Sequence, residues 1–169
     1  GNEAGKLLVS ISAISSAKTK YKGIKGFDHE LLILSSLAVN NYMASEVYDF
    51  AVMQADLFFQ EYSAVAKNIP QDRKASLDDL RYGVYVQRAA ARIMMDKSKH
   101  IEDAADDLAS ASEIPGMAPD ALKLTDKFLT EVPNSAELVS VRGYILGNLN
   151  RHNEAITAHT MAIVLNGKY

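Results

Sequence analysis

The sequence predicts an all-α protein of about eight helices, arranged as antiparallel hairpins that stack on one another. Helix-forming residues are frequent and runs of Val, Ile and Thr are sparse, which favours helix over strand. Only four prolines and nine glycines interrupt 169 residues, so long regular elements are expected. The segment 136–169 also reads as one complete helix–turn–helix unit. Because such a unit cannot bury its own apolar face, it needs neighbouring helices.

Four helices are expected in the first 100 residues, because apolar residues recur there at helical spacing. Asp28 is expected to cap the second helix and Ser45 to begin the third. The pair Asn40-Asn41 is expected to end the second helix, and Pro70 breaks the chain after the third. The predicted helices span residues 3–18, 28–41, 45–67 and 76–97.

Four shorter helices are expected in the remaining residues. The fifth spans about 100–113 and ends before Pro115-Gly116, and the sixth begins at Pro119. The last two lie in 136–169, with a turn at Asn150 between them. Short connections imply antiparallel neighbours, so the eight helices pair in order along the chain into four hairpins. The length suits a single domain with one core.

An internal repeat relates the last two hairpins. A shift of 34 residues places Ala109 on Gly143, and both are small enough for two helices to approach closely. The same shift places Gly116 on Asn150, and both residue types tolerate the left-handed backbone of a tight turn. An acidic residue followed by alanine then begins the second helix of each hairpin, at residues 120–121 and 154–155.

The segment 136–165 resembles a tetratricopeptide repeat, and the block 102–135 matches more weakly. Two positions depart from the family pattern: Val139 stands where a large aromatic residue is usual, and Arg142 replaces an aliphatic one. The resemblance implies a short right-handed TPR-like α-solenoid in a single all-α domain. In that domain divergent helical hairpins over 1–100 precede repeats over 102–135 and 136–169. The matching residues are Gly143, Tyr144, Leu146, Ala155, Ile156, Ala162 and Leu165, with Ala109, Ala121, Phe128 and Pro133 in the weaker block.

Composition narrows the classes of partner. The formal net charge is −3, so the overall basic character of a nucleic-acid-binding protein is missing, and no nucleic-acid partner is expected. The exception is a run with Lys18, Lys20, Lys22 and Lys25 around Tyr21. It is interpreted as a solvated loop, and the alternative is a contact surface for an anionic lipid or nucleic acid. Without cysteine there are no disulfides, thiolate nucleophiles or cysteine-ligated metals.

Residues for catalysis or metal binding do not assemble in the sequence. His152 and His159 are seven residues apart, whereas a helical metal pair needs a spacing of three or four. His159 is instead expected to pack in or near the core. Ser15 and Lys18 fit a Ser-x-x-Lys pattern without the partner motifs of Ser–Lys enzymes. We therefore expect no enzyme activity, no catalytic residue, no cofactor and no metal.

The leading functional hypothesis is a non-catalytic protein–protein interaction scaffold or adaptor. The tetratricopeptide resemblance implies a concave groove, lined by the first helix of each hairpin. The carboxylates of 102–107 are expected on the exposed arc of their helix, so the groove is acidic with one aromatic residue. A protein or peptide segment of basic or neutral charge is therefore the expected partner. Asp106 and Ser140 replace the lysine that some family members use to clamp a terminal carboxylate. The implied groove residues are Asp103, Asp106, Ser110, Glu113, Glu137, Ser140, Tyr144 and Asn148.

The alternative hypothesis is a small-ligand-binding or accessory subunit of a bacterial envelope or transport system, with a pocket among the N-terminal helices. It depends on the Phe, Tyr and Met side chains of the third and fourth helices. Phe58 and Phe59 cannot both face the same way, so one is either an exposed anchor or buried against a neighbouring helix. The chain begins with Gly1 and no methionine, from which we expect a preceding signal peptide or domain. An exported, periplasmic or lipid-anchored location is thus favoured over the cytoplasm, with no transmembrane segment expected.

Overall fold

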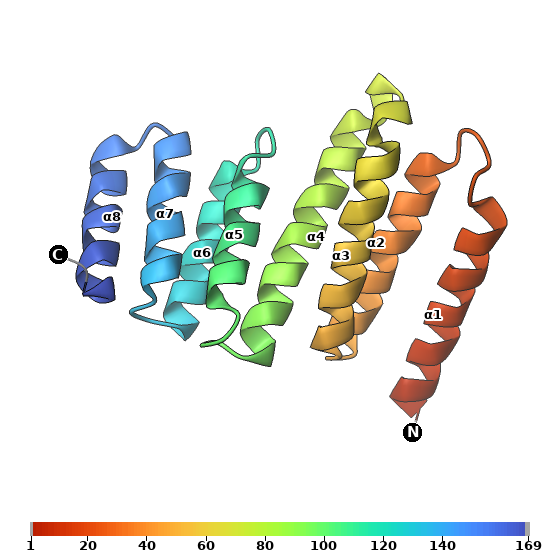
Figure 1. Ribbon diagram of the computed structural model, residues 1–169, viewed down its shortest axis with the longest axis horizontal. Coiled ribbons are helices and arrows are strands. Elements are labelled where there is room, and N and C mark those ends of the chain that lie inside the picture. Colours follow the sequence, from red (N-terminus) through yellow and green to blue (C-terminus); the bar gives the residue numbers. More distant parts are fainter. Residues whose placement is uncertain (1, 168–169) are drawn as a thin grey trace. The chain divides into compact units, whose positions relative to one another are not determined.

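The computed structural model describes residues 2–167, and within that range it contains eight α-helices and no strand. The predicted all-α class and helix number are therefore confirmed (Figure 1). Two short 3₁₀ helices, η1 (Ala66–Asn68) and η2 (Gln71–Arg73), flank Pro70. The α-helices are α1 (Asn2–Tyr21), α2 (Asp28–Ala44), α3 (Tyr48–Val65), α4 (Lys74–Met95), α5 (Ile101–Ser112), α6 (Ala118–Glu131), α7 (Ala136–Asn148) and α8 (His152–Asn166).

The chain divides into two compact units, residues 1–91 and 92–169. The division falls inside α4. The two units differ in charge. Residues 1–91 carry ten basic and ten acidic side chains, whereas residues 92–169 carry eight basic and eleven acidic ones. The whole net negative charge therefore belongs to the second unit.

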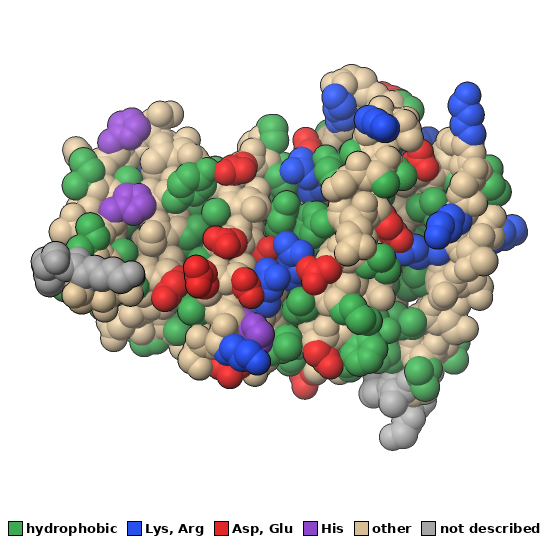
Figure 2. All heavy atoms as spheres, in the orientation of Figure 1, with side chains coloured by type: hydrophobic (Ala, Val, Ile, Leu, Met, Phe, Trp, Pro, Cys, Tyr) green, Lys and Arg blue, Asp and Glu red, His purple; other side chains and the backbone are tan. Residues whose placement is uncertain are grey.

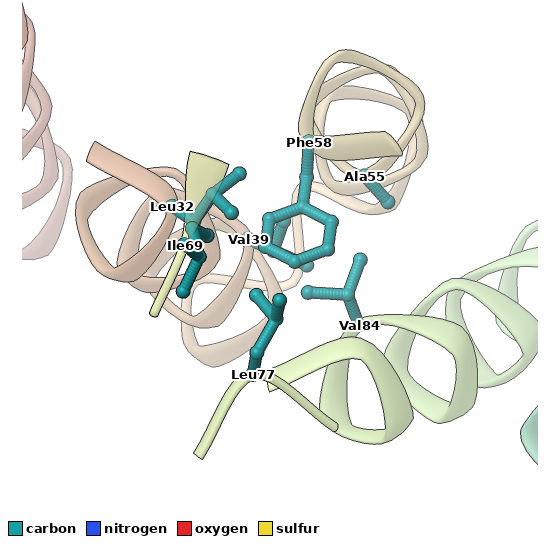
Figure 3. Close-up of a cluster of buried hydrophobic side chains, with 7 residues drawn as sticks. All are labelled: Leu32, Val39, Ala55, Phe58, Ile69, Leu77 and Val84. Carbon is teal, nitrogen blue, oxygen red and sulfur yellow. The ribbon is translucent and has the colours of Figure 1, made fainter. Parts of the chain in front are cut away.

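The core of the first unit lies where α2, α3 and α4 meet. The ring of Phe58 occupies its centre, surrounded by aliphatic side chains from both other helices (Figure 3). Complete burial of a phenylalanine side chain contributes about 1.5–3 kcal/mol, so this residue anchors α3 to its neighbours. The cluster consists of Leu32, Val39, Ala55, Phe58, Ile69, Leu77 and Val84.

A second layer of aromatic contacts joins α3 to α4. Phe59 is half-buried, with its ring centroid 4.1 Å from that of Tyr85. The guanidinium of Arg88 lies over the Phe59 ring at 4.6 Å and pairs with Asp56. Of the two outcomes that the sequence leaves open for the pair 58–59, burial of the second ring against a neighbouring helix is therefore observed.

Helix α1 packs on α2 and is held by a polar tie. None of its side chains from residue 5 onward is fully buried. The Lys18 ammonium lies 2.5 Å from Glu61 Oε1 on α3 and donates to Ser35 Oγ on α2 at 2.8 Å. The Ser35 hydroxyl in turn donates to the same carboxylate of Glu61. One lysine thus links three helices.

The second unit is built from two helix pairs, α5–α6 and α7–α8. Helix α7 packs against α5 and α6 as well as α8, so the last pair rests on the one before it. Gly116 and Asn150, the residues that the 34-residue shift superposes, have φ values of 82° and 58°. Both turns therefore use the left-handed backbone that the sequence predicts for them.

Two ion pairs connect helices of the second unit. Arg92 Nη1 lies 2.5 Å from Asp107 Oδ2, and the Asp107 residue is only 2% exposed. The expectation that Asp107 lies on an exposed acidic face is thus wrong, because a cation from the end of α4 compensates its burial. Arg142, which departs from the repeat pattern, pairs with Asp126 of α6 at 2.7 Å.

Several predicted helix ends differ from the observed ones. Asp28 is the first residue of α2, and Phe27 holds the cap position without a side-chain hydrogen bond. The pair Asn40-Asn41 lies inside α2, and Ser45 is its C-cap instead of the start of α3. The connection to α3 uses Glu46 with a φ of 59°, a conformation that no glycine signals in the sequence.

Candidate functional site

An open cleft in the second unit lies beside the α5–α6 connection. Its volume is about 700 Å³. Residues at the end of α5, in the turn, at the start of α6 and in the C-terminal half of α7 form its walls. They are Ser112, Glu113, Ile114, Pro115, Gly116, Ala118, Pro119, Tyr144, Asn148 and Leu149.

A tyrosine–glutamate hydrogen bond crosses one side of this cleft. Tyr144 Oη donates to Glu113 Oε1 at 2.5 Å, and this bond raises the pKa of the Tyr144 hydroxyl above its usual value of 10. One turn further along α7, Asn148 Nδ2 lies 3.5 Å from Ser112 Oγ. The cleft therefore offers a half-exposed ring, a carboxylate and an amide within one short stretch of wall.

Three of the eight predicted groove residues line this cleft: Glu113, Tyr144 and Asn148. Asp103 and Asp106 are exposed on α5 but do not line it. Ser110, Glu137 and Ser140 are half-buried and also lie outside the lining. Glu137 accepts a hydrogen bond from Ser135, the residue that caps α7, at 2.9 Å.

The acidic side chains of the second unit gather over α5 (Figure 2). Glu102, Asp103 and Asp106 are exposed there, and Glu113 follows at the C-terminal end of the helix. Because Asp107 is buried against Arg92, it does not contribute to this surface. The exposed carboxylates form a negative face that continues towards the cleft.

The sequence did not indicate the turn residues of the cleft. Pro115, Gly116 and Pro119 form much of its wall, whereas the sequence predicts only that they end one helix and begin the next. The position of a residue in a helical repeat predicts which helix face it lies on. It does not predict the conformation of the turn between two helices. The Pro-Gly pair was the only local signal.

The two residues of the Ser-x-x-Lys pattern have different partners. Lys18 contacts Glu61 and Ser35, while the main-chain carbonyl of Ser15 accepts a hydrogen bond from Thr19. Ser35 does contact the Lys18 amine, but it is only 1% exposed.

Two of the four histidines contact residues of neighbouring helices. The His159 ring lies against α7 at Gly143, where a Cβ would come within 3.0 Å of three of its ring atoms. His159 is nevertheless exposed, so the expectation that it packs in or near the core is wrong. His29 Nε2 lies 3.2 Å from Ser76 Oγ. Within residues 2–167, no three His, Asp or Glu side chains come together as a metal site would require.

The aromatic residues proposed for a pocket in the first unit are engaged in packing. Phe58 fills the core, and Phe59 stacks with Tyr85. Tyr62 lies under the Arg81 guanidinium, 4.9 Å from it. These contacts use the rings that would have lined an apolar pocket, and the ligand-binding alternative stays a prediction.

Comparisons with known proteins found no matching family, no matching curated protein and no matching solved structure. The tetratricopeptide resemblance, the solenoid arrangement and the single domain therefore stay predictions. Among the described residues, no helix has both the length and the apolar character needed to cross a bilayer.

Proposed function

We propose that the second unit binds an extended segment of a partner protein along the exposed face of α5 and into the cleft beside Tyr144. The observation that carries this proposal is the meeting of Glu113, Tyr144 and Asn148 in one cleft. The repeat resemblance implies the same three residues for the binding face. A half-exposed tyrosine beside a carboxylate can bind a peptide. The ring provides apolar contact area, and the carboxylate accepts hydrogen bonds that orient the peptide.

The charge of the surface selects the partner. Asp103 and Asp106 are exposed, and neither has its side chain in an ion pair among the described residues. A segment with lysine or arginine residues gains attraction to them, whereas an acidic segment is repelled. Because these charges lie in water, the attraction is screened at high salt.

A selection from a random peptide library on the full chain tests this function. We expect the selected peptides to be basic or neutral. Asp103→Lys with Asp106→Lys should weaken their binding about tenfold, since two exposed charges together contribute about 1–2 kcal/mol. Tyr144→Ala should also weaken binding. Fluorescence anisotropy at low and high salt measures both effects.

The matched control makes the same change in charge on α6 instead of α5. Asp120→Lys with Glu131→Lys alters two exposed residues of α6 and should leave binding close to that of the wild type after correction for net charge. If the reversal on α5 leaves peptide binding unchanged, this face is not the binding surface.

A further inference from the structure

The loop between α1 and α2 has a fixed shape. Two consecutive turns form it, closed by hydrogen bonds from Ile24 N to the Tyr21 carbonyl at 3.1 Å and from Phe27 N to the Ile24 carbonyl at 3.3 Å. Gly23 and Gly26 supply the positive φ values, 79° and 92°, that these turns require. The loop thus presents Ile24 between its two glycines.

Apolar side chains are exposed on this loop. Ile24 is 45% exposed and Phe27 is 37% exposed. Phe27 stacks on Tyr21 with ring centroids 4.9 Å apart, so the two rings support each other outside the core. Exposure of this aliphatic side chain and the aromatic pair to water is unfavourable, so they are suited to a partly apolar environment.

Lysines surround the exposed apolar side chains. Lys20, Lys22 and Lys25 are exposed, and none of them has an ion pair in the part of the chain that the structure describes. Lys20 lies over the Tyr21 ring at 5.4 Å. The fourth lysine of the run, Lys18, is directed inward to Glu61 and does not belong to this surface.

The same end of the first unit carries further charged residues. The α3–α4 connection lies at the end of the unit where the α1–α2 loop lies (Figure 1). Lys67, Asp72 and the first residue of α4, Lys74, are exposed there, and Arg73 pairs with Glu30. Both basic and acidic side chains are visible at this end in Figure 2. Within the loop itself, residues 19–27 contain lysines and no carboxylate, so the loop is the most basic part of this end.

We propose that this end of the first unit docks on an anionic lipid surface, with Ile24 and Phe27 entering the headgroup region. Lysines are attracted to acidic headgroups without fixed geometry, and their long stems let the ammonium stay in water while neighbouring apolar groups go deeper. Interfacial anchors combine basic and apolar residues in this way. A nucleic acid would explain the lysines but would leave the aliphatic tip without a partner.

This inference is independent of the peptide-binding proposal. It concerns residues 20–27 of the first unit, whereas the cleft lies in the second. A variant that loses one activity should therefore keep the other.

Vesicle sedimentation with the full chain tests the docking directly. We expect binding to vesicles of phosphatidylcholine with about one third phosphatidylserine, and little binding to phosphatidylcholine alone. Lys22→Gln with Lys25→Gln should lower the partition constant about 25-fold, since each lysine near such a surface contributes about fivefold. The matched control is Lys97→Gln with Lys99→Gln, two exposed lysines after α4, which should bind as the wild type does.

Insertion of the loop tip into the lipid can be measured by tryptophan fluorescence. The chain contains no tryptophan, so a single introduced one gives the whole signal. Ile24→Trp should show a blue-shifted emission with anionic vesicles and quenching by brominated lipid. Ile156→Trp, at an exposed isoleucine of α8, should show neither. Equal binding to neutral vesicles, or unchanged binding after removal of the two loop lysines, would overturn the proposal. So would binding of a single-stranded oligonucleotide through these lysines without binding to vesicles.

Discussion

Replacing Gly143 with alanine tests the closest approach inside the last helix pair. A Cβ at this position would lie 2.8 Å from His159 Cε1 and 2.9 Å from Nε2, whereas ordinary contacts begin at 3.4 Å. Two effects oppose each other. Alanine in place of a helical glycine stabilises by about 0.5–1 kcal/mol. Crowding in a packed contact costs about 1–3 kcal/mol.

The position of the ring decides the balance. His159 is exposed, so its imidazole can rotate away, and the cost should lie at the lower end of that range. We therefore expect Gly143→Ala to destabilise the wild type by about 0.5 kcal/mol. In a His159→Ala background it should instead stabilise by about 0.5–1 kcal/mol. The coupling free energy between the two positions is then about 1–1.5 kcal/mol, within the range for residues in contact.

Urea unfolding followed by circular dichroism at 222 nm measures these differences from the shift in midpoint at constant slope. Gly147→Ala is the matched control, because it lies on the same helix and a Cβ there would meet nothing within 4 Å. It should stabilise the chain equally in both backgrounds. If Gly143→Ala is also equally stabilising in both, then the ring does not lie against the helix.

Three further predictions concern capping, a buried ion pair and titration. Ser135→Ala removes the side chain that accepts from the first turn of α7, and chemical denaturation should show a loss of about 1 kcal/mol, with Ser135→Asn close to wild type. Asp107→Asn leaves Arg92 without its carboxylate and should cost about 3–5 kcal/mol, and a matched Arg92→Met with Asp107→Leu variant should recover much of it by thermal unfolding. The raised pKa of Tyr144 means that its hydrogen bond to Glu113 stabilises the fold fully below pH 10 and is lost as pH rises through the folded-state pKa. The difference in melting temperature between wild type and Tyr144→Phe should therefore be constant at neutral pH and shrink above pH 10, and a difference that grows there would contradict the assignment.

Features of the fold that depend on local chemistry were predictable from the sequence. Gly116 and Asn150 are residue types that tolerate a left-handed backbone, and both adopt it. For each turn the signal is the residue type itself. The 34-residue repeat adds information over a longer range, because its register puts Glu113, Tyr144 and Asn148 on one face although the first two are 31 residues apart.

Features that depend on distant partners which the repeat register does not relate were not predictable. Asp107 looked like part of an exposed acidic run, because nothing nearby reveals the arginine 15 residues earlier that buries with it. Ser35 binds groups from α1 and α3, and no residue near it in the sequence indicates these partners. Ser45 has a cap-forming side chain, yet the preceding helix extends up to it, since tertiary packing outweighs intrinsic preference.

The shallow attachment of α1 has a consequence for how the chain opens. Leu8 and Val9 are about 70% exposed in the folded chain, so detachment of this helix exposes little additional apolar surface to water. Opening free energies vary along a chain, and segments with few buried contacts have the smallest. Amide protons of α1 should therefore exchange with solvent well before those of α2 and α3. The N-terminal helix would separate as a unit of its own, ahead of the cooperative melting of the remaining helices.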